Sequence, residues 1–229
     1  MDEITSGFLH ALQLILSADP ALMEIIALSV GVSGCALGIS TVVGVPLGAG
    51  LGLSKVPGRG LITAVLYTGM GLPPVVVGLF VYLMLSRSGP LGTLSWLFTP
   101  SAMIVAQTII AFPLVTGLTM TAVQAVDPAL RLQVRSLGAD RIQETWAVLG
   151  EARVGVVAAI VAAFGGVISE VGAVMLVGGN IEGRTRVLTT AIVLETRKGE
   201  FALAIALGMI LLALAFAANL ALLRLQGRR

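Results

Sequence analysis

Long stretches without charged side chains constrain the fold of this chain more than any other feature. Five apolar stretches contain one charged residue between them, Glu170, and they span residues 25–54, 61–85, 88–126, 154–177 and 201–223. Each can hold the roughly 20 apolar residues that a membrane-spanning helix needs. Only 11% of the residues are charged, against about 25% in soluble domains. We therefore predict an all-α integral membrane protein with about five spanning helices.

The apolar stretch at 88–126 is longer than one span, and residues 1–19 precede the first span. Gly and Pro residues between positions 89 and 100 indicate a loop, which places the third spanning helix at 102–123. Residues 1–19 form an N-terminal amphipathic segment that is too short to span. Its apolar stripe comprises Phe8, Ala11, Leu12, Ile15 and Leu16. Asp19 and Pro20 then predict the cap of the first spanning helix, so residues 20–229 form one transmembrane domain.

A polar segment at residues 127–153 interrupts the apolar pattern. Asp127 followed by Pro128 is typical of a helix start, and Gly138 is typical of a helix end. Asp140 begins a second short helix that runs through Leu149. The segment is therefore predicted to be a helical hairpin at residues 127–150.

The Lys and Arg residues predict the orientation of the chain, because they accumulate on the cytosolic side. Nine fall on one side of the predicted spans: Lys55, Arg59, Arg131, Arg135, Arg141, Arg153, Arg224, Arg228 and Arg229. Five fall on the other: Arg87, Arg184, Arg186, Arg197 and Lys198. This predicts an N-terminus outside the cell, and a hairpin and C-terminus in the cytosol.

Glycines and prolines also mark the spans. Gly31, Gly34, Gly38, Gly44 and Gly48 run along the first span and favour close helix contact. Pro73, Pro74 and Pro113 predict kinks in the second and third spans.

The sequence argues against several classes of function. The net charge is only +2, which does not favour a nucleic-acid partner. A phosphate-binding loop of the G-x-x-x-x-G-K-[ST] type is not found, so we expect no nucleotide site and no enzyme activity in this chain. The single histidine, His10, lies outside the spans and gives no support for a metal site or an intramembrane protease. A secondary transporter with Glu170 as proton carrier remains a rival interpretation, although such proteins usually contain internal repeats.

Four motifs resemble the permease subunits of ATP-binding-cassette (ABC) importers for molybdate, tungstate and sulfate. They are LPPVVVG at 72–78, SGPLG at 88–92, RSLGA at 135–139 in the hairpin, and SEVGA at 169–173 with GGNIEGRTR at 178–186. The hairpin of this superfamily carries Glu-Ala-Ala before its glycine, and here Leu-Gln-Val stands at 132–134. VLTTAI at 187–192 is most similar to the tungstate branch, with molybdate, sulfate or another solute such as an amino acid as alternatives.

The resemblance implies a type I importer permease in a prokaryotic plasma membrane. It implies a second copy of the chain, two ATPase subunits that bind ATP and Mg, and an extracytoplasmic oxyanion-binding protein, with membrane lipid around the spanning helices. The chain itself would hold no cofactor. The residues expected to contact the ATPase are Leu130, Arg131, Leu132, Val134, Arg135, Leu137, Gly138, Ala139 and Arg141.

The substrate pathway is expected to use neutral polar groups, because no span contains Lys or Arg and conduction requires favourable but weak contacts. The candidates are Ser40, Thr41, Thr68, Gln107, Thr108, Thr116 and the acidic Glu170. A carboxylate in the membrane is costly, so Glu170 is predicted to pair with Arg184 or Arg186, to accept from helix-end amides, or to be protonated. The loop 178–200 is predicted to face outward, to hold a short helix at 187–194, and to contact the binding protein through Arg184, Arg186, Arg197 and Lys198.

Overall fold

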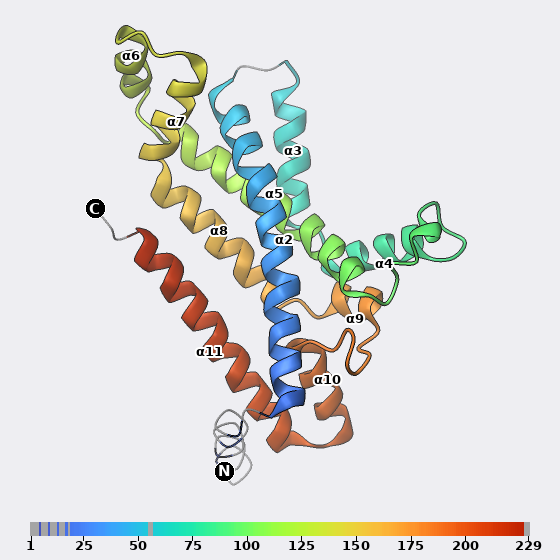
Figure 1. Ribbon diagram of the computed structural model, residues 1–229. Coiled ribbons are helices and arrows are strands. Elements are labelled where there is room, and N and C mark those ends of the chain that lie inside the picture. Colours follow the sequence, from blue (N-terminus) through green and yellow to red (C-terminus); the bar gives the residue numbers. More distant parts are fainter. Residues whose placement is uncertain are drawn as a thin grey trace.

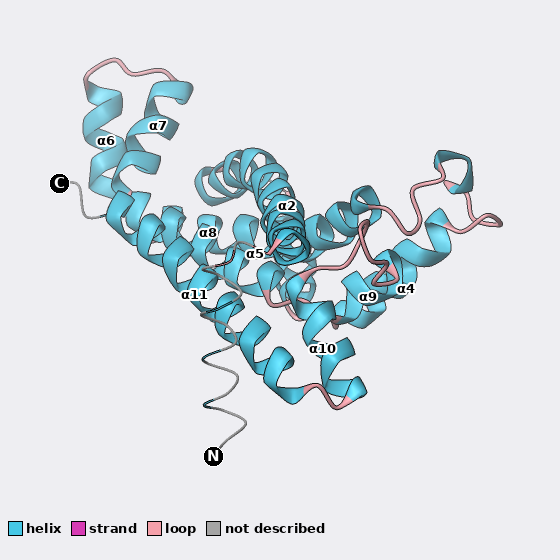
Figure 2. Ribbon diagram, turned by 60° about the horizontal axis from the view of Figure 1, so that its bottom comes forward, coloured by secondary structure: helices cyan, strands magenta, loops and turns pink. Residues whose placement is uncertain are grey.

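The computed structural model describes residues 19–54 and 57–226, together with Thr5, Leu9, Gln13 and Ser17. Every regular element in these residues is a helix, as Figure 2 shows. The prediction of an all-α protein is confirmed. The predicted apolar stripe of the N-terminal segment (Phe8, Ala11, Leu12, Ile15 and Leu16), His10, Lys55, Arg228 and Arg229 lie outside the described residues.

Two long helices, α2 (Pro20–Leu53) and α5 (Pro100–Gln124), pack along one another at the centre of the bundle. The predicted cap is present, because Asp19 Oδ1 accepts a hydrogen bond from Leu22 N at 2.9 Å. Glycine permits the close approach: a Cβ atom at Gly48 would lie 2.5 Å from the carbonyl oxygen of Thr116. Gly44 faces Thr116 in the same way, whereas Gly31, Gly34 and Gly38 have open space beside them.

The second predicted span is not a single helix. Helix α3 (Arg59–Met70) and helix α4 (Pro74–Leu85) meet at an angle of 99°. The break lies at Gly71–Pro73, where proline has no N–H to continue the helical hydrogen bonds. The predicted proline kink is thus present, but it is a sharp turn after which α4 runs sideways, away from α2 (Figure 1).

The prediction of one helix over 154–177 is wrong. Helix α8 (Arg153–Ile168) ends before Glu170, and the short helix α9 (Gly172–Gly178) follows. At its other end, α8 meets the preceding helix, α7 (Arg141–Glu151), at an angle of 71°. A break at a polar residue is tolerated in a membrane where protein covers the freed backbone groups, and here Thr189 Oγ1 donates to the carbonyl oxygen of Glu170.

Three helices of the described chain are long and apolar enough to cross a membrane alone: α2, α5 and the segment Phe201–Ala221 of α11 (Phe201–Gln226). The number rises to at most five if each of the two bent pairs is counted as one span, so the predicted count of about five is the upper limit of this range. The third predicted span, 102–123, lies within α5. A loop with the 3₁₀ turn η1 (Gly92–Leu94) comes before it, as expected.

The two ends of the molecule differ in structure. Figure 1 shows α6 (Pro128–Ser136) and α7 at one end, and α10 (Leu188–Lys198) with the start of α2 at the other. The helix predicted at 187–194 therefore exists but continues to Lys198, where Gly199 with φ +82° ends it.

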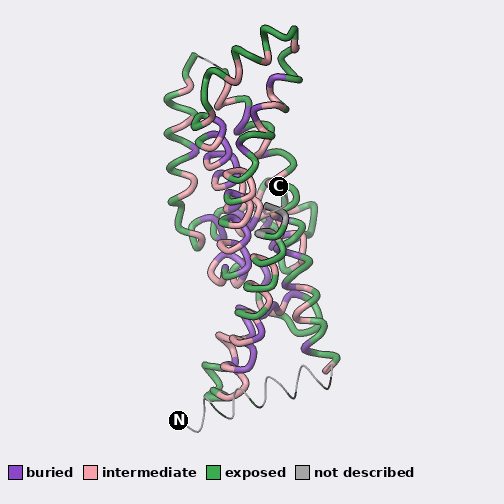
Figure 3. The backbone as a smooth tube through the Cα atoms, turned by 90° about the vertical axis from the view of Figure 1, so that its left-hand side faces the viewer, coloured by how far each residue is buried: buried purple, intermediate pink, exposed green. Residues whose placement is uncertain are grey.

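Buried residues lie mostly in the middle of the bundle, and exposed residues lie on its outside (Figure 3). The largest cluster joins α4, α5 and α9 through Val81, Met103 and Val177. Apolar side chains on the outside, among them Val42, Leu212 and Phe216, are exposed. Such a surface suits contact with lipid rather than water.

Candidate functional site

The hairpin formed by α6 and α7 is shaped by local capping. Asp127 Oδ1 accepts from Ala129 N at 2.8 Å, and Gly138 adopts φ +86° where α6 ends. Asp140 accepts from the amides of Ile142 and Gln143, and Gln143 Oε1 accepts in return from Asp140 N. The predicted hairpin is confirmed, although α7 ends at Glu151 rather than Leu149.

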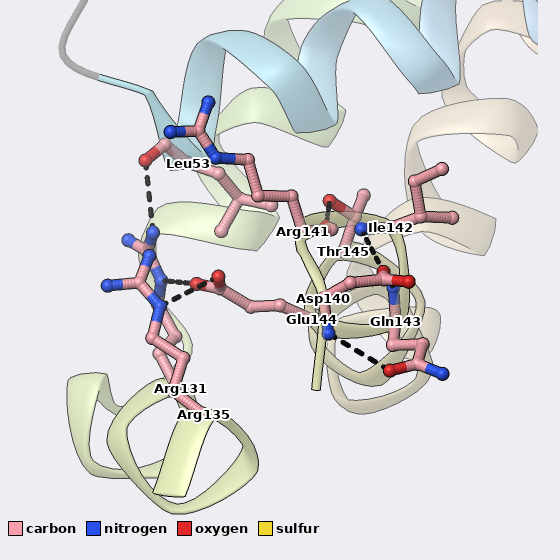
Figure 4. A network of polar contacts seen from close by, with 9 residues as sticks. All are labelled: Leu53, Arg131, Arg135, Asp140, Arg141, Ile142, Gln143, Glu144 and Thr145. Carbon is pink, nitrogen blue, oxygen red and sulfur yellow. Dashed lines mark hydrogen bonds and ion pairs between the residues drawn. The ribbon is translucent and has the colours of Figure 1, made fainter. Parts of the chain in front are cut away.

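A buried carboxylate holds the two arms of the hairpin together (Figure 4). Glu144 on α7 is only 4% exposed. Its two oxygens accept from Arg131 Nε at 2.7 Å and from Arg135 Nε at 2.8 Å. Arg131 also donates to the carbonyl oxygen of Leu53 at 3.2 Å, which ties the hairpin to the end of α2.

The two arginines determine the charge of Glu144. The hydrogen bond from Arg135 lowers the pKa of this carboxyl group, burial opposes the effect, and the hydrogen bond from Arg131 lowers it further. The net pKa lies below the usual 4.5, so Glu144 is ionised at neutral pH. Sequence analysis missed this residue. Its spacing of four from Val148, which is also buried, was the signal that it faces inward.

The hairpin exposes several large apolar side chains among its polar ones. Leu132, Leu137, Ile142 and Trp146 are all more than two-thirds exposed. Ile142 and Trp146 were not predicted, although their spacing of four residues places them on one face of α7. A polar segment with this much exposed apolar area is suited to bind a partner.

The predicted hairpin residues do not all face outward. Leu130 packs against the core cluster of Ala49 and Val148, so it is not available to fill a groove on another protein. Arg131 is engaged with Glu144 and Leu53. Val134 and Ala139 are half-buried, whereas Leu132, Arg135, Leu137, Gly138 and Arg141 are exposed.

The predicted pathway residues are dispersed across the bundle. Ser40, Gln107 and Thr116 are buried, Thr41 and Thr108 are half-buried, and Thr68 is exposed on α3. Ser40 Oγ donates to Thr108 O at 3.4 Å, and Gln107 Nε2 donates to Val167 O at 2.9 Å. The Oε1 atom of Gln107 has no partner in the described part of the chain.

Glu170 lies at the break between α8 and α9. Its Oε1 accepts from Ala173 N at 2.9 Å, which corresponds to the helix-end amide among the predicted partners. Arg186 instead pairs with Glu182 at 3.1 Å, and within the described residues neither Arg184 nor Arg186 forms an ion pair with Glu170. Glu170 and Gln107 both line a small cavity of about 10 Å³.

The helix α10 and the loop before it, which carry the basic residues predicted to contact a binding protein, lie at the end of the molecule opposite the hairpin (Figure 1). Arg184 and Arg197 are exposed. Lys198 pairs with Glu195 at 2.9 Å, and Arg186 is largely covered. The structure therefore separates the two predicted contact regions by the length of α2.

The described chain is thus a helical bundle with a hairpin of two short helices, α6 and α7, at one end. Residues 44–229 match the family described as binding-protein-dependent transport system inner membrane component, and the chain belongs to this family.

Within this family, the chain is similar to permeases whose names include their cargo. The chain is 42% identical, over 99% of both chains, to the tungstate uptake system permease protein of Peptoclostridium acidaminophilum. It is 47% identical to the probable anion ABC transporter permease protein of Haloferax volcanii, over 86% of this chain and 88% of that one. The molybdenum transport system permease protein of Escherichia coli is 30% identical over 63% of this chain and 67% of its own.

A solved structure shows the same fold. An amino acid ABC transporter determined with histidines superimposes with a TM-score of 0.59 at 16% identity, over 92% of this chain and 93% of that one. The predicted type I permease fold is thereby confirmed.

Proposed function

We propose that this chain is the transmembrane permease of an ATP-driven importer for a tetrahedral oxyanion, with tungstate as the cargo. The observation that carries the proposal is the similarity to a tungstate permease over 99% of both chains. The similarity to the molybdenum permease is lower and covers 63% of this chain.

The hairpin is the proposed contact with the ATPase. Leu132, Leu137, Ile142 and Trp146 offer an exposed apolar surface, and Glu144 makes it stiff. An ATPase that pulls on this surface would act directly on α2, because Arg131 joins the hairpin to Leu53. The energy then comes from two partner ATPase subunits that bind ATP and Mg, and this chain holds no cofactor and catalyses no reaction itself.

The assembly is proposed to contain two copies of the chain and an extracytoplasmic oxyanion-binding protein. The hairpin and the C-terminus are assigned to the cytosol and the N-terminus to the outside, following the distribution of Lys and Arg. Arg184, Arg186, Arg197 and Lys198 then lie on the outer side, where they can contact the binding protein. Because the spans contain no Lys or Arg, selectivity for the cargo is assigned mainly to that binding protein.

Reconstitution tests the proposal. The permease is co-purified with its ATPase, placed in liposomes, and supplied with the binding protein loaded with tungstate, molybdate or sulfate. We expect tungstate to give the largest stimulation of ATP hydrolysis and uptake. A larger response to molybdate or sulfate would reassign the cargo. Uptake that persists with an inactive ATPase would overturn the importer proposal in favour of a secondary transporter.

A further inference from the structure

A cavity of about 400 Å³ lies where the hairpin meets the end of α2. This volume falls in the range of about 300–1,000 Å³ that is typical of small-molecule sites. Its charged lining consists of Arg131, Arg135, Arg141 and Glu144. Three guanidinium groups face one carboxylate, so the lining carries two positive charges that Glu144 does not offset.

The hydrogen bonds of this cluster leave many donors free. Arg131 and Arg135 each donate one hydrogen bond to Glu144, through Nε. Arg131 also donates a hydrogen bond from one terminal nitrogen to Leu53 O. The other terminal nitrogen of Arg131, both terminal nitrogens of Arg135 and all three nitrogens of Arg141 form no hydrogen bond with the described residues. Figure 4 shows Arg131 and Arg135 reaching from α6, and Arg141 from the start of α7, toward the end of α2 at Leu53.

We propose that this cavity binds a tetrahedral oxyanion of the phosphate type. Guanidinium groups present paired N–H donors that match the oxygens of such anions, and charge-assisted bonds of this kind are the strong ones. The carboxylate of Glu144 does not prevent anion binding, because the lining still carries two positive charges after its charge is offset. A bound oxyanion would join α6, α7 and α2 at one point.

Two sources can supply the oxyanion. One is a free ion such as inorganic phosphate or tungstate. The other is the phosphate of an anionic lipid headgroup, since the cavity lies at the end of a spanning helix and basic pockets on the cytosolic side of membrane proteins bind such headgroups. That location rests on the proposed orientation, whereas the binding chemistry depends only on the arginines.

The first experiment uses the purified permease–ATPase complex in detergent, without the binding protein. Its thermal midpoint is titrated with sodium phosphate and sodium tungstate, against sodium chloride at matched ionic strength. Arg141→Gln is the test variant, because Arg141 is exposed and has no partner that the fold requires. Arg153→Gln is the matched control, since Arg153 is exposed on α8 and lies outside the cavity.

We expect a saturable rise of the midpoint in the wild type and in Arg153→Gln. Arg141→Gln should weaken the apparent Kd about tenfold, the loss expected for one charge-assisted hydrogen bond. Arg141→Lys should restore part of the affinity, because it retains the charge but not the planar group.

The second experiment identifies a lipid source. The complex is placed in nanodiscs of phosphatidylglycerol or phosphatidylcholine, and the lipid retained after extraction is measured by native mass spectrometry. Retention of phosphatidylglycerol by the wild type and Arg153→Gln, with loss in Arg141→Gln, assigns the site to a lipid headgroup. If Arg141→Gln behaves as the wild type in both experiments, the proposed site does not exist. Neither experiment measures import, so a failed tungstate uptake assay would leave this result intact.

Discussion

Replacing Glu144 with Gln should loosen the hairpin without unfolding the bundle. The glutamine has nearly the same shape and retains one oxygen that can accept from an arginine, but it loses the negative charge. Two charge-assisted hydrogen bonds depend on that charge. Such a bond contributes about 1.5–3 kcal/mol, and Arg135 is half exposed, which reduces its share. We therefore expect a loss of about 2 kcal/mol in the closure of α6 onto α7.

Amide hydrogen exchange measures this loss directly. A change of about 2 kcal/mol corresponds to roughly a 30-fold faster exchange of the amides in α6, while amides in α5 serve as an internal reference. Glu151→Gln is the matched control, since Glu151 is an exposed carboxylate on the same helix with no ion pair in the described structure. Equal exchange of α6 in the wild type and in Glu144→Gln would refute the assigned role of the carboxylate.

Three further predictions follow from the same structure. Because its arginine partners hold the pKa of Glu144 below 4.5, the protection of α6, corrected for intrinsic exchange rates, should stay constant from about pH 8 to about pH 5 and decline only as the pH falls below 4.5. A rise in protection on acidification would contradict this sign. Gly48→Ala should lower the melting temperature of the purified permease, because the new Cβ would lie 2.5 Å from Thr116 O and overpacking costs about 1–3 kcal/mol; Gly34→Ala, with nothing within 4 Å, should not lower it. Trp146→Ala should reduce co-purification of the ATPase while leaving the melting temperature of the permease unchanged, whereas Trp96→Ala, in the loop before α5, should retain the ATPase. An equal loss of ATPase in both variants would argue against a docking surface on α7.

Local features of the hairpin could be predicted because their physics is local. Asp127, Gly138 and Asp140 act on amides within three residues or on their own φ angle, so their spacing in the chain was sufficient. Glu144 could not be assigned in this way. Its partners Arg131 and Arg135 lie on the other arm, and only the folded hairpin brings the three side chains together.

The spanning helices, too, could be predicted only in part. Their number followed from apolar length, but the breaks depend on tertiary contacts that replace lost helical hydrogen bonds. A proline at 73 indicates a kink, yet the 99° between α3 and α4 depends on the packing of α4. The buried neighbours of that helix lie on the next long helix, α5, and on α9, which is far along the chain.

The close packing of α2 against α5 has a mechanical consequence. At about 1.5 Å per residue, the 34 residues of α2 form a rod of about 51 Å, and its contacts with α5 at Gly44 and Gly48, toward the Leu53 end, leave no room for a methyl group. The rod cannot slide past its neighbour at this contact, so a displacement of its Leu53 end tilts it about Gly48. A tilt of about 10° would move the Leu53 end by about 1 Å and the Pro20 end, about 42 Å from Gly48, by about 7 Å. In the proposed orientation, a small displacement of the cytosolic end of α2 would thus become a several-fold larger movement of its outer end.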